Sequence, residues 1–322
     1  MNDDDGLIYA CRLDGKGGAT EVGWEALTRP DAGFVWAHLH LDSARARCWL
    51  AEESGLPAIV AEALIYEDVR PRCTPVGDGL LVNLRGVNLN PGADPEDMVA
   101  VRIYIDARRA VSVRRRRMMA VQDIRDEFAA GRGPCDAGDF IVELARRLVE
   151  RMGPVIGDLD DAIDDVEDRV LAAGGAEHRT ELWRLRRMAI ALRRYIAPQR
   201  EAMGRLVGER TEWIDARNGQ RLREVADRIT RYVEDLDSAR ERAAVVQDEL
   251  NTRMTERINR NMYVLAVIAA IFLPLSLLTG LLGVNVAGIP GDKWPWAFGT
   301  VSAGLLLIGV LEYLFFRKMK WL

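Results

Sequence analysis

Charged residues are scarce at one end of this 322-residue sequence. Of its 44 basic and 49 acidic side chains, only six lie in the last 62 residues. A soluble globular protein spreads its charges along the chain, so this segregation excludes an ordinary soluble fold. It indicates a water-soluble body joined to an apolar C-terminal tail.

Several function classes lack the residues they need. The net charge of −5 argues against a general nucleic-acid binder. No Gly-x-x-x-x-Gly-Lys-Ser/Thr loop is present, which argues against an ATP-driven machine, and no nucleophile–base or metal-hydrolase pattern indicates an enzyme. The four cysteines form no Cys-x-x-Cys pair, so we expect reduced thiols. The N-terminus has no basic region followed by an apolar run, so we expect no cleaved secretory signal.

Two long apolar stretches fill the tail. Residues 261–291 contain no Asp, Glu, Lys, Arg or His, and residues 262–282 form their apolar centre. A helix needs roughly 20 apolar residues to cross a bilayer, so this stretch can span. Residues 296–316 form a second stretch, interrupted by one acid, Glu312. A buried core helix is the competing interpretation, but two such stretches joined by a short loop favour a membrane hairpin.

The basic residues predict how this hairpin is oriented. Three arginines precede the first stretch and three basic residues follow the second, whereas the loop between them has only Lys293. The positive-inside rule therefore places both termini in the cytoplasm and the short loop outside.

The water-soluble body divides into two parts by pattern. Residues 1–136 are expected to form a cytosolic α/β domain, with strands over 34–39, 80–87, 98–105 and 110–113 and helices over 44–54, 57–67 and 118–130. Strands that follow one another without a helix between them predict a mixed or partly antiparallel sheet. Residues 137–260 are expected to form a helical stalk, and residues 261–322 the membrane domain.

The stalk is predicted to contain three helical regions. They cover 139–173, with a bend at Gly153-Pro154, then 177–207, and a third that starts near Asn218 and continues without a break to about Leu282. The third has apolar positions in steps of three and four, a heptad pattern that requires a partner helix or neighbouring subunits: Leu222, Val225, Ile229, Tyr232, Leu236, Ala239, Ala243, Val246 and Leu250. Such a helix could transmit motion into the membrane or serve only as a spacer.

One face of the first apolar stretch is a candidate lining for an aqueous path. Its members, spaced by three and four, are Met262, Leu265, Ala269, Leu273, Ser276 and Gly280. Two spans per chain cannot enclose such a path, so several copies would have to meet at a symmetry axis. In the competing interpretation, this face simply packs on the second span.

A short motif follows the first stretch. Gly283-Val284-Asn285 resembles the Gly-Met-Asn signature of the CorA superfamily of divalent-cation transporters, in the form found in its ZntB zinc-transport branch. Its position at the outer end of the first of two C-terminal spans makes the resemblance specific. Residues 84–93 and the run Arg114-Arg115-Arg116-Arg117 also resemble the cytosolic domain of that branch, so the likeness covers most of the chain.

The resemblance implies a function and an assembly. It implies a homopentameric funnel in the bacterial inner membrane, with zinc as the transported ion, no resident cofactor, and only its own copies, divalent cations and the lipid bilayer as partners. The family's axis-facing positions match Asn259 and the six lining residues, and Asn285 matches the signature asparagine that meets the metal ion. Asp248 matches an acidic residue near the cytosolic end of the pore, where it either belongs to a ring of carboxylates that attracts cations or is an ordinary solvated helix charge. Direction and proton coupling stay open. A magnesium or cobalt channel of the CorA type and a non-conducting coiled-coil scaffold are the alternatives.

Three further features have two interpretations each. His38 and His40 fall on one face of a strand with Asp42 beyond them, which fits either a cytosolic zinc site or, more often for such a pair, a structural role. Residues 158–168 carry seven acids, which either concentrate cations or form a solvated helix face, the favoured interpretation. Glu312 is costly in hydrocarbon and is expected to snorkel or to pair with Lys318 or a neighbour.

Overall fold

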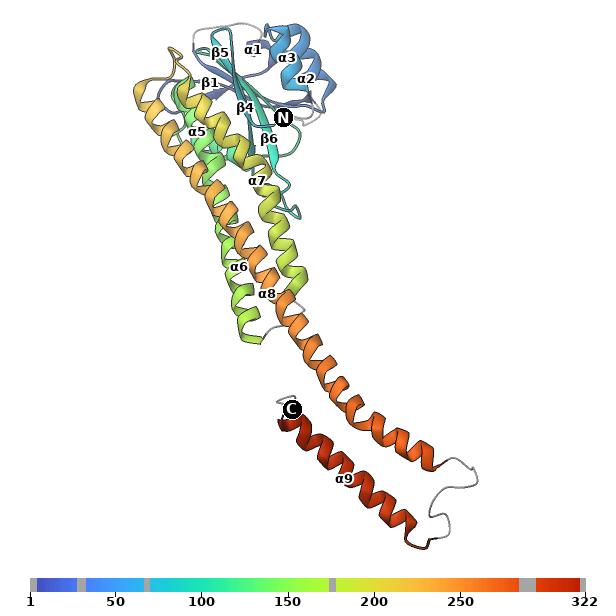
Figure 1. Cartoon of the computed structure of the whole chain (residues 1–322). Coiled ribbons are helices and arrows are strands. Elements are labelled where there is room, and N and C mark those ends of the chain that lie inside the picture. The colour runs from blue at the N-terminus through green and yellow to red at the C-terminus, as the bar shows by residue number, and fades with distance from the viewer. Residues whose placement is uncertain (1–4, 28–32, 67–69, 174–177, 284–293, 319–322) are drawn as a thin grey trace. The chain divides into compact units, whose positions relative to one another are not determined.

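A computed structural model describes residues 5–27, 33–66, 70–173, 178–283 and 294–318 (Figure 1). The chain folds as two compact units, Met1–Gln247 and Asp248–Leu322. The first contains a sheet with helices on both faces and a helical stem. The second contains two apolar helices. One helix of 67 residues, α8 (Ala216–Leu282), belongs to both units, so the uninterrupted helix predicted from about Asn218 is confirmed.

The first unit is built around a sheet of seven strands in the order β2-β1-β3-β7-β6-β5-β4. β3 and β7 are parallel and all other neighbours are antiparallel, which confirms the predicted mixed sheet. The strands are β1 (Leu7–Leu13), β2 (Ala19–Glu21), β3 (Val35–His40), β4 (Arg72–Val76), β5 (Gly79–Gly86), β6 (Val99–Ile105) and β7 (Arg109–Arg114).

Three of these strands were not predicted. β1 is buried along most of its length instead of alternating between buried and exposed residues. β2 has only three residues, and β4 is a largely exposed edge strand that contains Pro75. Proline is tolerated at an edge, where its missing N–H faces no partner strand. None of the three therefore has the period-two pattern by which half-buried strands are recognised.

Helices cover both faces of the sheet (Figure 1). One face packs on α2 (Ala44–Cys48), the π-helical turn η2 (Trp49–Glu53) and α3 (Ala58–Ile65) through a core that includes Leu39, Trp49 and Leu64. The other face packs on α4 (Met119–Ala129) and α5 (Ala137–Glu150), where Trp36 meets Phe128 and Phe140. The short α1 (Trp24–Leu27) lies beside the first of these layers, since Trp24 stacks on Trp49.

The stem consists of α6 (Met152–Ala173), α7 (His178–Gly208) and the N-terminal part of α8 (Figure 1). The predicted apolar seam of α8 is buried within this single chain from Leu222 to Val246, except that Tyr232 is only half-buried. Arg242 of α8 pairs with two acids of α6, and Arg193 of α7 donates to Asp237 of α8 at 2.5 Å. The heptad pattern allowed either a partner helix of the same chain or neighbouring subunits. The chain's own helices are therefore sufficient to cover this seam.

Two details of the stem differ from the prediction. The helical region from 139 to 173 is divided at Arg151, not bent at Gly153-Pro154. Pro154 lies in the first turn of α6, where its missing N–H has no helical partner to lose. In the acidic run 158–168, Asp160 and Asp164 are the two partners of Arg242, so part of this run has a structural role.

The second unit holds the C-terminal part of α8 and α9 (Ala297–Lys318). Both helices are long and apolar enough to cross a membrane, and almost none of either apolar window is buried inside the chain. The two predicted spans, 262–282 and 296–316, lie in these helices.

Candidate functional site

The predicted lining residues of α8 are exposed in the single chain. Met262, Leu265 and Leu273 expose 61%, 66% and 70% of their surface, and the other four positions, Asn259, Ala269, Ser276 and Gly280, are also in the exposed class. At roughly 100° per residue, these positions occupy one side of the helix. This side therefore has no partner within the described part of the chain.

The opposite side of α8 packs on α9. Val267 is buried. The side chain of Leu275 lies close to Gly309 of α9: a Cβ atom added to Gly309 would be 3.8 Å from Leu275 Cδ1. By the same helical geometry, Val267 and Leu275 lie about half a turn away from Leu265 and Leu273. The competing interpretation, in which the lining face packs on the second span, does not fit this arrangement.

The ends of the predicted pathway are described only in part. α8 ends at Leu282, and the N–H of Gly283 donates to the carbonyl of Thr279 at 2.9 Å. Val284 and Asn285 of the motif lie outside the described residues. Asp248 is exposed on α8, and its backbone carbonyl accepts a hydrogen bond from Thr252 Oγ1 at 3.0 Å.

The described lining residues offer few ligands for a metal ion. Among the described residues, no group of three or more His, Cys, Asp or Glu side chains could hold a metal. Asn259 and Ser276 are the polar members of the lining set, and both offer neutral oxygen atoms. Protein zinc sites use His, Cys or carboxylate ligands at short range, so this face suits an ion that keeps its hydration shell.

Of the histidine pair, His38 belongs to the core of the first unit and His40 is half-buried at the end of β3. His38 is fully buried on β3, and its Nδ1 lies 2.8 Å from Ser112 Oγ, which also accepts a hydrogen bond from Trp36 Nε1. Burial holds the pKa of His38 well below its usual range. The Nδ1 of His40 accepts a hydrogen bond from the N–H of Asp42 at 3.3 Å. These contacts fit the structural interpretation of the pair.

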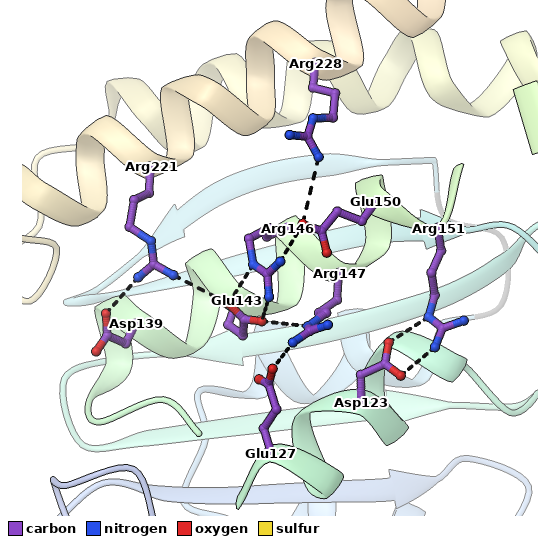
Figure 2. Close-up of polar contacts among 10 residues, drawn as sticks. All are labelled: Asp123, Glu127, Asp139, Glu143, Arg146, Arg147, Glu150, Arg151, Arg221 and Arg228. Carbon is purple, nitrogen blue, oxygen red and sulfur yellow. Dashed lines mark hydrogen bonds and ion pairs between the residues drawn. The ribbon is translucent and has the colours of Figure 1, made fainter. Parts of the chain in front are cut away.

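A network of ion pairs fastens the start of α8 to the sheet domain (Figure 2). Its centre is Glu143 of α5, whose side chain is only 10% exposed. This carboxylate pairs with Arg146 and Arg147 of its own helix and with Arg221 of α8, the last at 3.5 Å. Helix α8 is thus held by a charge that lies at the base of the stem.

The network extends in both directions from Glu143 (Figure 2). Towards the sheet, Arg147 pairs with Glu127 of α4. Beside the network, a separate pair also joins α5 to α4, because Arg151 donates two hydrogen bonds of 2.5 and 2.7 Å to Asp123. Towards α8, Arg221 also reaches Asp139 at 3.1 Å, and Arg228 lies 3.9 Å from Glu150. Sequence analysis missed this network because its links between helices join residues far apart in the chain. The local pairs within α5 are visible as a sequence pattern, because Glu143 lies about one turn from Arg146 and Arg147, and Arg146 about one turn from Glu150.

Comparison with known proteins identifies the family. The model of the CorA-like Mg²⁺ transporter protein family matches residues 31–318, and the chain belongs to this family. It is therefore a member of a transporter family, and its two apolar helices indicate a membrane protein.

Individual relatives are similar over nearly their whole length. The zinc transport protein ZntB of Pectobacterium carotovorum is 39% identical over 98% of this chain and 96% of its own. The divalent cation transporter CmaX of Pseudomonas aeruginosa is 40% identical over 99% of this chain and 98% of its own.

Solved structures show the same fold. The structure of full-length CmaX, at 38% identity, covers 100% of both chains with a TM-score of 0.87. The CorA magnesium transporter of Methanocaldococcus jannaschii, at 16% identity, covers 98% of this chain and 99% of its own with a TM-score of 0.82, which shows a shared fold alone.

Proposed function

We propose that this protein transports divalent cations, zinc foremost, through a pore on the axis of a homopentamer. The observation that carries the proposal is the side of α8 that holds the lining set, because it is turned away from α9 and has no partner within the described part of the chain. Copies of the same chain supply that partner when the lining faces meet around an axis. The names of the similar transporters ZntB and CmaX support a divalent cation as the substrate.

The chemistry of the lining sets how an ion passes. A mostly apolar wall conducts only when it is wetted, so the ion moves with much of its water retained. With both termini in the cytoplasm, a membrane potential that is negative inside favours entry of a dication by about 4.6 kcal/mol per 100 mV, taking roughly 2.3 per charge. Inward movement is thus the default direction without a second energy source.

The polar residues at the two ends have separate roles in this proposal. At the outer end, a ring of Asn285 side chains offers neutral carbonyl dipoles that accept hydrogen bonds from the water around a dication without holding it too tightly. At the inner end, a ring of Asp248 carboxylates attracts cations to the entrance. Gly283 permits the turn that ends the helix before Asn285.

Uptake of radioactive zinc into proteoliposomes tests the proposal. We expect Asn285→Ala to abolish selective flux while leaving the oligomer intact, as checked by cross-linking, and Asn261→Ala, a second asparagine of the same segment outside the lining set, to behave like the parent. Undiminished and equally selective flux through Asn285→Ala would remove this amide from the mechanism.

Two further measurements separate the alternatives. Competition among zinc, magnesium and cobalt in the same vesicles distinguishes a zinc transporter from a magnesium or cobalt channel. Absence of any dication flux from a correctly assembled oligomer would instead favour the membrane-anchored scaffold. Uptake with and without a pH gradient tests proton coupling.

A further inference from the structure

The second unit contains a groove between its two helices in which an acidic side chain lies. Glu312 of α9 lines this groove together with Ala270 and Pro274 of α8, among leucine and phenylalanine side chains. Its Oε2 atom has no exposed surface and no hydrogen-bond partner in the described part of the chain. Glu312 is also the single acid between residues 294 and 322. An incompletely bonded carboxyl group inside an apolar helix pair requires a partner.

The same groove contains a backbone group that also lacks its usual partner. Pro274 lies inside α8 and has no N–H. In an α-helix this N–H would donate to the carbonyl four residues earlier, which is that of Ala270. The carbonyl oxygen of Ala270 is therefore free to accept a hydrogen bond from another group, and Ala270 and Glu312 both line this groove.

We propose that Glu312 binds a proton within the membrane and donates it, as a hydrogen bond, to the carbonyl oxygen of Ala270. A neutral carboxylic acid has one O–H to donate, and this bond completes both groups at once. An ionised carboxylate has no proton to donate and is far more costly in hydrocarbon. The proton comes from bulk water and returns to it, so no other reactant is needed.

The charged surroundings of Glu312 define what happens when the proton leaves. No Asp, Glu, Lys, Arg or His lies in residues 262–282 of α8, so the helix packed against Glu312 contributes no charge there. On α9, Lys318 lines the same groove, with Tyr313 and Arg317 nearby in sequence. The ionised carboxylate is therefore drawn towards Lys318 and away from Ala270.

Protonation of Glu312 would affect the lining of the pathway, an effect that rests on the proposed transport function. Pro274 follows Leu273 and precedes Ser276, two of the lining positions. Helices bend at proline because one hydrogen bond is missing and the ring crowds the preceding turn. A bond from Glu312 to Ala270 stabilises one bend of α8, so protonation of Glu312 selects one arrangement of the lining residues beyond Pro274.

Zinc flux in proteoliposomes at a series of pH values, equal on both sides and with the membrane potential clamped, tests the functional part. Over the pH range in which the parent flux depends on pH, it changes by up to about tenfold per pH unit, the slope of a single proton. Glu312→Gln keeps a donor but cannot ionise, so we expect its flux to stay at the low-pH value of the parent. Glu201→Gln, an exposed acid on α7, is the matched control and keeps the parent's profile. A full pH dependence in Glu312→Gln would overturn the proposal.

Infrared difference spectroscopy tests whether Glu312 binds a proton, independently of any transport measurement. Raising the pH should remove from the parent a carboxylic-acid C=O band that is missing in Glu312→Gln. Pro274→Ala restores an N–H for Ala270, so we expect the band to shift to higher frequency as the acid loses its acceptor. Absence of the band, or a band that Pro274→Ala leaves unchanged, would overturn the site. A parent that shows the band but moves no zinc at any pH would instead contradict the proposed function.

Discussion

Removal of the charge on Glu143 is the sharpest test of the ionic network that holds α8. The substitution Glu143→Gln keeps the shape of the side chain and deletes the one carboxylate that three arginines share. Breaking a fully buried ion pair costs about 3–5 kcal/mol when the remaining charge has no other partner. Here each arginine keeps a second acid: Arg146 has Glu150, Arg147 has Glu127 and Arg221 has Asp139.

The expected cost is therefore lower than for a stranded charge. Hydrogen bonds to charged groups contribute about 1.5–3 kcal/mol each, and the amide replaces part of what is lost, so we expect a destabilisation of about 2 kcal/mol. In a unit of this size, 1 kcal/mol changes Tm by about 2–4 °C, which predicts a fall of about 4–8 °C. The detergent-solubilised full chain can be unfolded by heat and followed by circular dichroism.

The control for this experiment is an ion pair at the surface of the same stem. Glu241 is 74% exposed and lies 3.7 Å from Arg240, so Glu241→Gln should change stability by less than about 0.5 kcal/mol. An unchanged Tm in Glu143→Gln would refute the reasoning. So would an equal fall in both variants, because the effect would then not depend on burial or on the shared position of Glu143.

Two further predictions concern the core of the first unit. The imidazole of His38 is buried and its pKa lies well below the ordinary value, so the unfolded chain binds a proton below about pH 6.5 that the folded chain does not. Stability should fall by about 1.4 kcal/mol per pH unit below that point, and thermal unfolding of His38→Asn should show a correspondingly flatter dependence on pH. Burial also raises the pKa of the Cys11 and Cys73 thiols to about 12. Maleimide at neutral pH should therefore label only the exposed Cys48 and the half-buried Cys135, and mass spectrometry that finds the other two labelled before unfolding would contradict the structure.

The fold was predictable where a pattern extended over many residues. The two spans follow from hydropathy, and the continuous α8 follows from a heptad pattern without Gly or Pro through the stalk. The central strands β3, β5, β6 and β7 were also predicted, because their apolar runs are bounded by turn residues. The edges of the sheet were missed, since β2 is short and β4 contains Pro75.

The residues on the lining face of α8 were predictable from the sequence, but the neighbours of that face were not. The spacing of the lining set placed its residues on one face of a helix, because helical periodicity is a local property. The neighbours of that face were not predictable, since the same spacing fits packing on α9 or meeting other copies. The position of α9 on the opposite side, beside Val267 and Leu275, is a tertiary fact.

Length, hydropathy and period alone determined that this protein has two helices long and apolar enough to cross a membrane, a long helix leading into the first of these segments and an α/β domain before it. These properties depend on residues close together in the chain. Tertiary structure decided that the seam of α8 is covered by the chain's own α6 and α7, that His38 is a core residue, and that Glu143 joins α8 to α5. The physical reason is that burial and ion pairing depend on which distant residues meet in space. A pattern in the sequence indicates only that a surface is apolar or charged, not which residues pack against it.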